Sequence, residues 1–529
     1  MNKTFYITTP IYYPSGNLHI GNVYTTLLCD AIARYKKERG YDVYFLTGTD
    51  EHGQKIQEKA KSEGKTPIEY LDGIVSEIKD LWKELQICND DFIRTTESRH
   101  EKIVEKVFSR FLEQGDIYLG QYEGWYCTPC ESFFTESQLV DGKCPDCGRE
   151  VKKAHEEAYF FKMSKYSNRL LDFYKQHPDM VNPQSRLKEV VSSFIEPGLE
   201  DLCVSRTSFD WGVKVKENPK HVVYVWLDAL LNYVTALGYG SDNPELYEKY
   251  WVKGDQIVHV LGKDITRFHL IYWPVFLMAL GLKLPDKFLV HGWVVMKDGK
   301  MSKSKGNVVY PLPLKELYGL DLLKYYMLRE MPATEDGLFT PEQFVDRCNA
   351  DLANNFGNLT HRTLSMIKKY FAGNVPAYNG RVTEFDGALE DATKAYTQMF
   401  YDKMDNLDVS NALEYVFELA NAANKYIDDT KPWALAKEEG GKEKLESVMS
   451  HLVNVIYRLS VLLSPVLLDG SKKVLDMLNV KEELRNYKAL ELPFGSYGNV
   501  KLSETIAPVY QRLDANVEIE RMKERIYRK

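Results

Sequence analysis

The first fifty residues alternate between a strand pattern and a helical pattern. Residues 3–9 are β-branched and aromatic, and residues 10–17 contain the residue types that favour turns. From His19 apolar positions recur at helical spacing up to a stop at Gly40, and residues 41–46 form a second strand pattern that ends at Thr47–Asp50. This order predicts one βαβ unit with parallel strands. Ligands lie beyond the carboxyl ends of such strands, so we expect the loops 10–21 and 47–53 to line one pocket.

The strand pattern is then interrupted and returns later in the chain. A third strand is predicted over 91–96 and a helix from Ser98 to about Gly115, after which the alternation breaks at Tyr118. Residues 118–215 contain short strands and clustered cysteines. Strand patterns reappear at 221–226, 256–261 and 287–295. The order predicts one sheet that is split by an insertion.

After about Asp346 only helical periodicity remains. It is clear in residues 351–370, 385–404 and 445–463, so the last third of the chain is predicted to be a helical bundle. The last nine residues carry five basic side chains and one acidic side chain, which is typical of a solvated helix end.

Composition excludes several classes of protein. The 529 residues have a formal net charge of −8, so the surface as a whole is not that of a strongly basic nucleic-acid-binding protein, and any RNA contact must be local. The longest apolar run, 270–282, contains a proline and is shorter than the ~20 residues that a membrane helix needs. The first nine residues lack the apolar core of a secretory signal. We therefore expect a cytoplasmic protein.

Four of the eight cysteines form two closely spaced pairs. Cys127 and Cys130 make one C-x₂-C motif, and Cys144 and Cys147 make a second after thirteen intervening residues. This spacing is typical of a tetrahedral four-thiolate zinc site, and four thiolates leave no open position for catalysis, so the zinc is predicted to be structural. The alternative, disulfides or idle thiols, fits a chain without an export signal less well. We interpret the remaining, isolated cysteines as packing residues: Cys29, Cys88, Cys203 and Cys348.

Two further motifs predict a nucleotide site. His19-Ile-Gly21-Asn22 stands where the first helix begins, at the end that binds anions, and Gly21 would let a ligand approach closely. Lys300-Met-Ser-Lys303-Ser-Lys-Gly306 follows a hairpin pattern at 297–299. Taken singly, they are interpreted as a capping or core histidine and a solvated loop. Together they predict a histidine at the α-phosphate of a nucleotide and mobile lysines that neutralise a departing polyphosphate.

These motifs resemble the HIGH and KMSKS signatures of class I aminoacyl-tRNA synthetases, and the surrounding sequence resembles methionyl-tRNA synthetases over nearly the whole chain. The other blocks that carry this resemblance are Pro10–Tyr13, Thr47–Gly53, Val225–Tyr233, Gly262–Asp264, the four cysteines and Lys431–Trp433. Asn22 departs from the family, which usually has histidine there. Asparagine can donate a hydrogen bond but cannot carry positive charge.

The resemblance implies an α/β fold in which a Rossmann-like parallel sheet is split by a zinc-bearing insertion and followed by a helical bundle. The implied parts are the catalytic domain (1–117 and 216–290), the insertion (118–215), a linker with the lysine loop (291–346), an anticodon-binding bundle (347–500) and a C-terminal helix (501–529). The implied activity is ATP-dependent formation of methionyl-adenylate with release of pyrophosphate, then transfer to the 3′-terminal adenosine of initiator and elongator methionine tRNA. Mg²⁺ accompanies ATP.

The resemblance also implies roles for individual residues. His19, Asn22, Lys300 and Lys303 are catalytic by this analogy. Methionine is expected among Ile11, Tyr13, Asp50, Trp226, Ala229, Leu230, Tyr233, Phe268, His269 and Trp273. Asp50 would hold its ammonium group, and Tyr13 and His269 could hydrogen-bond its sulfur. Without the family, such an aromatic set is usually core packing.

ATP is expected at His19, Gly21, Asn22, Gly262, Asp264, Val295, Met296 and Lys303. Asp264 could equally cap a helix that begins at Ile265. The anticodon is expected at Asn354, Asn358, Arg362 and Trp433, where an exposed tryptophan can stack on a base and the polar side chains can bind its edge. The alternative for Trp433 is a core anchor of the bundle.

Other functions remain possible at this stage. Leucine, isoleucine and valine enzymes of class I would need a longer insertion than 118–215, and a cysteine enzyme would need a zinc with an open position. A non-catalytic RNA-binding or scaffold protein is opposed by the intact lysine loop and left open by Asn22. Many members of the family carry a further C-terminal tRNA-binding and dimerising domain beyond the region that this sequence covers, which ends at Lys529 either as a natural short form or as part of a longer protein; we expect a monomer.

Overall fold

The computed structural model describes residues 2–14, 16–128, 132–134, 136–145, 147–301, 306–332 and 334–526. The chain divides into two compact units. We call Met1–Leu18 with Asp42–His291 the sheet unit, and His19–Tyr41 with Gly292–Lys529 the bundle unit. Among the described helices, none combines the length and apolar character needed to cross a membrane.

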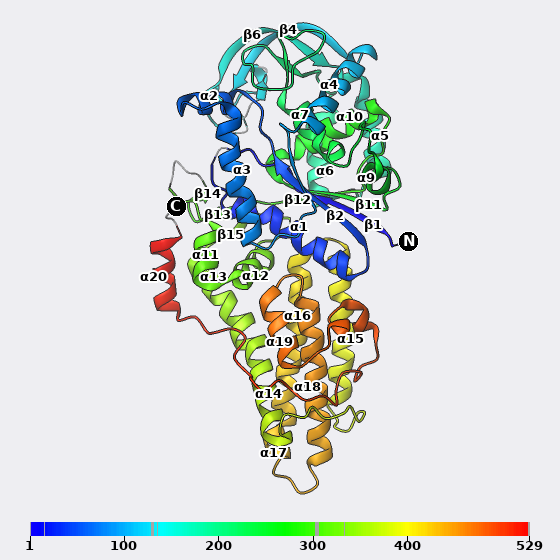
Figure 1. Cartoon of the computed structure of the whole chain (residues 1–529), viewed down its shortest axis with the longest axis vertical. Helices are drawn as coiled ribbons and strands as arrows, with labels where there is room; N and C mark the ends of the chain where they lie inside the picture. Colours follow the sequence, from blue (N-terminus) through cyan, green and yellow to red (C-terminus); the bar gives the residue numbers. More distant parts are fainter. Residues whose placement is uncertain are drawn as a thin grey trace. The chain divides into compact units, whose positions relative to one another are not determined.

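The sheet unit is built on a six-stranded sheet in the order β3-β2-β1-β11-β12-β7, and every neighbouring pair is parallel (Figure 1). Its strands are β1 (Thr4–Thr8), β2 (Asp42–Thr49), β3 (Asp91–Arg94), β7 (Val181–Asn182), β11 (Gln256–Gly262) and β12 (Lys287–His291). The predictions for the first three strands and for 256–261 are confirmed. The strand order reverses between β1 and β11, which is where a doubly wound sheet binds its ligand.

Two predicted strands were wrong in part. The run 221–226 does not join the parallel sheet, because only β10 (Val222–Val223) is extended and it pairs with the antiparallel β9 (Ser205–Arg206). Helix α7 (Val225–Leu230) follows directly. The prediction was wrong because a short apolar run is equally compatible with a strand and with a buried helix. The run 287–295 divides after His291. A Cβ on Gly292 would lie 2.0 Å from the carbonyl oxygen of Glu335, a close approach that only glycine allows.

The insertion carries an antiparallel sheet in the order β5-β4-β6-β8. Its strands are β4 (Ile117–Cys127), β5 (Ser132–Phe134), β6 (Lys152–Phe161) and β8 (Leu202–Cys203). Strand β7 also comes from within 118–215 but pairs with β12 of the parallel sheet, which the sequence did not predict.

Helices complete the sheet unit. They are α2 (Gln54–Ser62), α3 (Pro67–Glu84), α4 (Ser98–Glu113), α5 (Ser167–Gln176), α6 (Gln184–Val190), α7, α8 (Asn232–Thr235), α9 (Glu245–Tyr247) and α10 (Trp273–Leu280), with π-helical turns η3 (Val191–Ile195), η4 (Glu248–Val252) and η6 (Phe268–Tyr272) and 3₁₀ turns η1 (Glu136–Gln138), η2 (Met163–Tyr166) and η5 (Lys263–Ile265).

The bundle unit begins with α1 (Ile20–Glu38), which ends as predicted where Gly40 takes a positive φ of 81°. A hairpin of β13 (Val294–Met296) and β14 (Gly299–Lys300) and the short β15 (Gly337–Leu338) form its one sheet in the described residues. The remaining elements are α11 (Pro311–Tyr318), α12 (Leu320–Glu330), α13 (Pro341–Arg347), the π-helix η7 (Cys348–Gly357), α14 (Asn358–Phe371), α15 (Asp386–Asp405), α16 (Val409–Thr430), α17 (Pro432–Leu435), α18 (Lys442–Leu463), α19 (Leu468–Met477), the 3₁₀ turns η8 (Glu482–Leu484) and η9 (Tyr487–Glu491), and α20 (Ala515–Arg525).

The predicted helical bundle is confirmed: α15, α16 and α18 pack against one another, and α14 packs on α16 and α18 (Figure 1). The helix predicted over 501–529 is shorter. Residues 501–514 are irregular, since Lys501 pairs with Asn374 and Pro508 cannot donate a backbone hydrogen bond. Helix α20 packs on α13 through the buried Met522.

Helix α1 is bound to the bundle by one fully buried ion pair and by a second in which a buried lysine meets an exposed carboxylate. Asp30 Oδ2 lies 2.7 Å from Lys324 Nζ of α12, and both side chains are buried. Lys36 Nζ lies 2.8 Å from Asp405 Oδ1 at the end of α15. These contacts tie the helix that begins at His19 to the bundle unit.

Candidate active site

The N-terminus of α1 is closed by the side chains of its own first motif. His19 is the N-cap, and its Nδ1 accepts a hydrogen bond from the Gly21 N–H at 3.1 Å. Asn22 Oδ1 accepts from the His19 N–H at 3.2 Å, so the two side chains form a capping box. Because Nδ1 is an acceptor, the proton of a neutral ring lies on Nε2. The capping interpretation of His19 is confirmed.

The described residues on either side of 302–305 lie next to this helix end within the bundle unit. A Cβ on Gly21 would lie 3.7 Å from Met301 Cε, and the Ile20 N–H donates to the Val309 carbonyl at 3.0 Å. The two motifs that predicted a nucleotide site are therefore brought together.

The predicted hairpin at 297–299 is confirmed, since Val295 pairs with Lys300 across the turn. Lys300 is exposed, and its Nζ lies 3.9 Å from the centre of the Trp293 ring. Val295 is half-buried and Met296 is buried. Lys303 lies outside the described residues.

In the sheet unit, the loops after β1 and β2 are joined by backbone hydrogen bonds. The Tyr12 N–H donates to the Gly48 carbonyl at 2.8 Å, and the Asp50 N–H donates to the Tyr12 carbonyl at 2.9 Å. Ile11 and the buried Asp50 are thereby held at the carboxyl ends of neighbouring strands. Tyr13 packs against the small core cluster that contains Ile56 and Tyr70, with Lys55 Nζ 4.9 Å from its ring centre.

Most of the predicted aromatic residues form one cluster. Trp226 and Phe268 stack with ring centres 3.7 Å apart and planes at 12°. Tyr233 Oη lies 2.7 Å from His269 Nε2, and its ring lies 5.6 Å from that of Trp273. Ala229, Leu230 and Trp273 are buried. The cluster joins α7, α8, η6 and α10.

His269 is neutral and fully engaged in this cluster. Its Nδ1 faces the carbonyl oxygen of Ile265 at 3.0 Å and so must donate, which leaves Nε2 to accept from the Tyr233 hydroxyl. Burial lowers the pKa of His269 to about 4. In this arrangement both ring nitrogens of His269 have partners within the protein, so the expected hydrogen bond from His269 to a sulfur atom would require one of these contacts to be released.

Gly262 and Asp264 lie at the end of β11, on the switch point of the sheet. A Cβ on Gly262 would lie 2.7 Å from Asp264 Oδ1, so a larger side chain here would displace this exposed carboxylate. Asp264 is exposed and lies inside the turn η5, of which Gly262 is the N-cap. The alternative in which Asp264 caps a helix beginning at Ile265 is therefore wrong.

Glu51 lies within the block Thr47–Gly53, but no role was predicted for it. It is fully buried next to Asp50, and its carboxylate accepts from Arg94 Nε at 2.8 Å and from the Thr49 and Thr96 hydroxyls, each at 2.6 Å. Trp211 Nε1 donates to its carbonyl at 2.6 Å. No local pattern predicts this, because the partners come from separate strands and loops.

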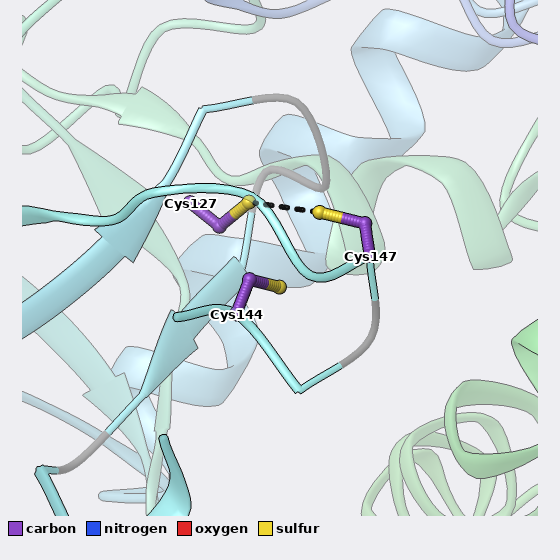
Figure 2. A group of neighbouring side chains, drawn as sticks. All are labelled: Cys127, Cys144 and Cys147. Carbon is purple, nitrogen blue, oxygen red and sulfur yellow. Dashed lines mark hydrogen bonds between the residues drawn. The ribbon is translucent and has the colours of Figure 1, made fainter. Parts of the chain in front are cut away.

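Three of the four clustered cysteines lie within the described residues, and their sulfur atoms point toward one another (Figure 2). Those of Cys127, Cys144 and Cys147 all lie within 4.8 Å of one another, and Cys127 Sγ is 3.6 Å from Cys147 Sγ. That distance excludes a disulfide between them, which would be about 2.05 Å. Cys130 lies outside the described residues. Of the isolated cysteines, Cys29, Cys203 and Cys348 are buried as predicted, and Cys88 is half-buried.

The predicted anticodon residues lie on η7, α14 and α17. Asn354 and Asn358 are exposed, and Arg362 Nη2 lies 3.7 Å from Asp428 Oδ1 of α16. Trp433 is 43% exposed after the buried Pro432, so its interpretation as a core anchor is wrong.

Asn355 was not predicted to matter, yet it holds this surface in place. It is buried, donates to Asn421 Oδ1 and accepts from Asn424 Nδ2, each at 2.7 Å. These bonds fix η7 on α16 and leave its neighbour Asn354 facing outward. Sequence spacing could not separate the two asparagines, because π-helical geometry changes which positions share a face.

Comparisons with known proteins agree with these observations. The family model described as tRNA synthetases class I (M) matches residues 5–157 and 149–364, and the anticodon binding domain of methionyl tRNA ligase matches 375–491. The methionine–tRNA ligase of Bacillus subtilis (strain 168) is 54% identical over 98% of this chain and 79% of its own length. That of Halalkalibacterium halodurans is 54% identical over 98% and 80%. A crystal structure of Mycobacterium tuberculosis methionyl-tRNA synthetase bound by methionyl-adenylate is 39% identical, with a TM-score of 0.91 over 96% of this chain and 100% of that one. The chain therefore belongs to the methionyl-tRNA synthetase family of class I aminoacyl-tRNA synthetases.

Proposed function

We propose that this chain is a methionine–tRNA ligase that activates methionine with ATP and transfers it to the 3′-terminal adenosine of methionine tRNA. The observation that carries the proposal is the match to methionine–tRNA ligases over 98% of the chain, which spans both phosphate-binding motifs.

Methionine is proposed to bind at the switch point of the parallel sheet. The Asp50 carboxylate pairs with its ammonium group, and the backbone of Ile11 lies beside it. The thioether is placed against the stacked rings of Trp226 and Phe268 and beside Tyr233, where aromatic edges favour sulfur. Because His269 is a neutral acceptor whose partner is Tyr233, it acts by orienting that ring.

Activation is proposed to proceed by in-line attack of the methionine carboxylate on the α-phosphorus of ATP. The new bond joins a carboxylate oxygen to phosphorus, and the bond from phosphorus to the pyrophosphate oxygen breaks. His19 Nε2–H and the dipole of α1 stabilise charge on the α-phosphate, and Lys300 and Lys303 stabilise the leaving pyrophosphate. Mg²⁺ bound with ATP would neutralise further phosphate charge. Gly262 and Asp264 are assigned to the ribose, and Val295 and Met296 to the adenine.

Asn22 is assigned mainly a positioning task. Its Oδ1 holds the His19 backbone through the capping box, so it keeps the imidazole oriented without carrying charge. This accounts physically for a neutral amide at a position where the family usually has histidine.

The simplest test is pyrophosphate exchange into ATP with each of the twenty amino acids in turn. We expect exchange with methionine alone in the presence of Mg²⁺. Exchange with another amino acid would overturn the substrate assignment, and its absence with all twenty, from a folded sample, would favour a non-catalytic RNA-binding role. We also propose that the protein acts as a monomer in the cytoplasm; light scattering coupled to gel filtration tests the first point.

The cysteine cluster is proposed to hold one structural zinc ion. Zinc–sulfur bonds of about 2.3 Å in a tetrahedron place sulfur atoms about 3.8 Å apart, which fits the spacing of Cys127 and Cys147. Cys130 completes the set of four thiolates. Such an ion would cross-link the end of β4 to the loop before β6.

Replacement of Cys144 by alanine is expected to remove most of the bound zinc and to lower the temperature of unfolding, because a three-thiolate site loses both affinity and its cross-link. Elemental analysis and thermal denaturation measure both. Cys203→Ala is the matched control, since Cys203 is buried but outside the cluster. Full zinc content in Cys144→Ala, or none in the unmodified protein, would contradict the assignment.

Trp433→Ala is expected to lower kcat/KM for aminoacylation of methionine tRNA by roughly 5- to 150-fold, because stacking on one base contributes about 1–3 kcal/mol. Pyrophosphate exchange, which needs no tRNA, should be unchanged. Met399→Ala removes an equally exposed apolar side chain from the same unit and serves as control. Equal losses in both reactions would show that Trp433 supports folding and does not read the anticodon.

A further inference from the structure

A buried carboxylate on α7 binds two histidines from distant parts of the sheet unit. Asp228 is fully buried. Its Oδ2 lies 2.7 Å from His52 Nδ1, and its Oδ1 lies 2.8 Å from His100 Nε2. His52 follows β2, and His100 belongs to α4, so the three residues join a loop and two helices that are far apart in sequence.

His52 is the charged partner of Asp228. Its Nε2 lies 3.4 Å from Glu101 Oε1, so both ring nitrogens face carboxylates and both carry hydrogens. Burial opposes this charge, but the two carboxylates raise the pKa of His52 to about 10. Burial also opposes ionisation of Asp228, yet the histidines lower its pKa to about 2. The pair is therefore ionic at neutral pH.

Each member of this ion pair lies close in sequence to one part of the proposed methionine pocket. Asp228 stands between Trp226 and Ala229 on α7, the helix assigned to the thioether. His52 is two residues after Asp50, which is assigned to the ammonium group. Glu51 lies between Asp50 and His52 in the sequence, and its side chain is held by Arg94, Thr49 and Thr96. Movement of His52 is therefore transmitted to Asp50 through a restrained backbone.

Resting on the proposed function, we propose that Asp228 is a positioning residue that sets the distance between the ammonium-binding Asp50 and the thioether-binding side chains of α7. His52 and His100 hold its two oxygens. Asp228 itself touches no reacting atom. The pocket thus depends on a contact between residues 176 positions apart.

The test is pyrophosphate exchange with methionine and ATP varied separately. In Asp228→Asn an amide N–H₂ faces one imidazole N–H, and His52 loses the nearer of its two counter-charges while Glu101 remains. We expect KM for methionine to rise by about tenfold or more, because shifts of ~1 Å in a binding group cost up to about 100-fold. KM for ATP should stay within about twofold. His52→Leu should behave in the same way, and His52→Asn should recover part of the loss, since its amide can donate from near the Nδ1 position.

Asp116→Asn is the matched control for lost stability. Asp116 is also a fully buried carboxylate of the sheet unit, bound to Lys165 and Tyr166 and not assigned to the pocket. It should lower the temperature of unfolding without changing KM for methionine.

An unchanged KM for methionine in Asp228→Asn would overturn the proposal. The proposal would also be overturned if Asp228→Asn raised KM for both methionine and ATP and if Asp116→Asn, at the same temperature of unfolding, raised both by as much. Unmodified protein without methionine-dependent exchange would instead refute the proposed function, and the positioning role with it.

Discussion

Replacing Asp50 by alanine is expected to lower kcat/KM for methionine in pyrophosphate exchange by roughly two to four orders of magnitude. Asp50 is only 8% exposed, so water cannot replace the carboxylate that meets the ammonium group. Removing one partner of a buried ion pair costs about 3–5 kcal/mol, and each 1.4 kcal/mol is tenfold. The loss should fall mainly on methionine, with KM for ATP nearly unchanged.

Two companion variants make this result interpretable. Asp50→Asn keeps the shape of the side chain and should lose almost as much, because the charge is what the ammonium group requires. Asp172→Ala removes an exposed carboxylate of the same unit and should leave exchange as it is. If kcat/KM for methionine in Asp50→Ala lay within about threefold of that of the unmodified enzyme, the ammonium assignment would be refuted. A loss that small corresponds to well under 1 kcal/mol.

His19→Asn is expected to lower kcat of exchange by on the order of 100-fold or more while leaving α1 intact. Asparagine is among the best N-cap residues, so the hydrogen bond to the Gly21 N–H can be retained. What is lost is the Nε2–H donor that we assign to the α-phosphate, and one such donor in a transition state contributes about 100- to 1,000-fold. Rapid-quench or steady-state exchange at saturating substrates measures kcat.

His19→Ala separates the two tasks of this side chain. It should lose the same rate and also unfold at a lower temperature, because the cap is gone. If His19→Asn exchanged at nearly the rate of the unmodified enzyme, capping would be the only task of His19.

Local patterns predicted the elements whose signals lie close together in the chain. The βαβ unit from β1 to β2, the hairpin before the lysine loop and the helices α15 and α18 were predicted from periodicity and turn residues alone. The prediction of secondary structure was wrong where the residues adjacent in sequence do not determine whether a segment is a strand or a helix. Residues 221–226 are as apolar as a buried strand, yet the extended part ends at Val223 and α7 begins at Val225. Helix α7 carries Asp228 into contact with His52 and His100.

The same contrast holds for the candidate site. Sequence alone determined the cysteine pairs, the first motif at a helix start and the lysine cluster, because each is a matter of spacing over a few residues. The tertiary structure decided that Trp433 is exposed, that Asn355 is buried beside Asn354, that His269 is a neutral acceptor and that His52 and Asp228 form an ion pair. These properties depend on burial and on partners that lie far away in the chain. Desolvation and the charge of a distant neighbour set them, and neither can be deduced from the order of adjacent residues.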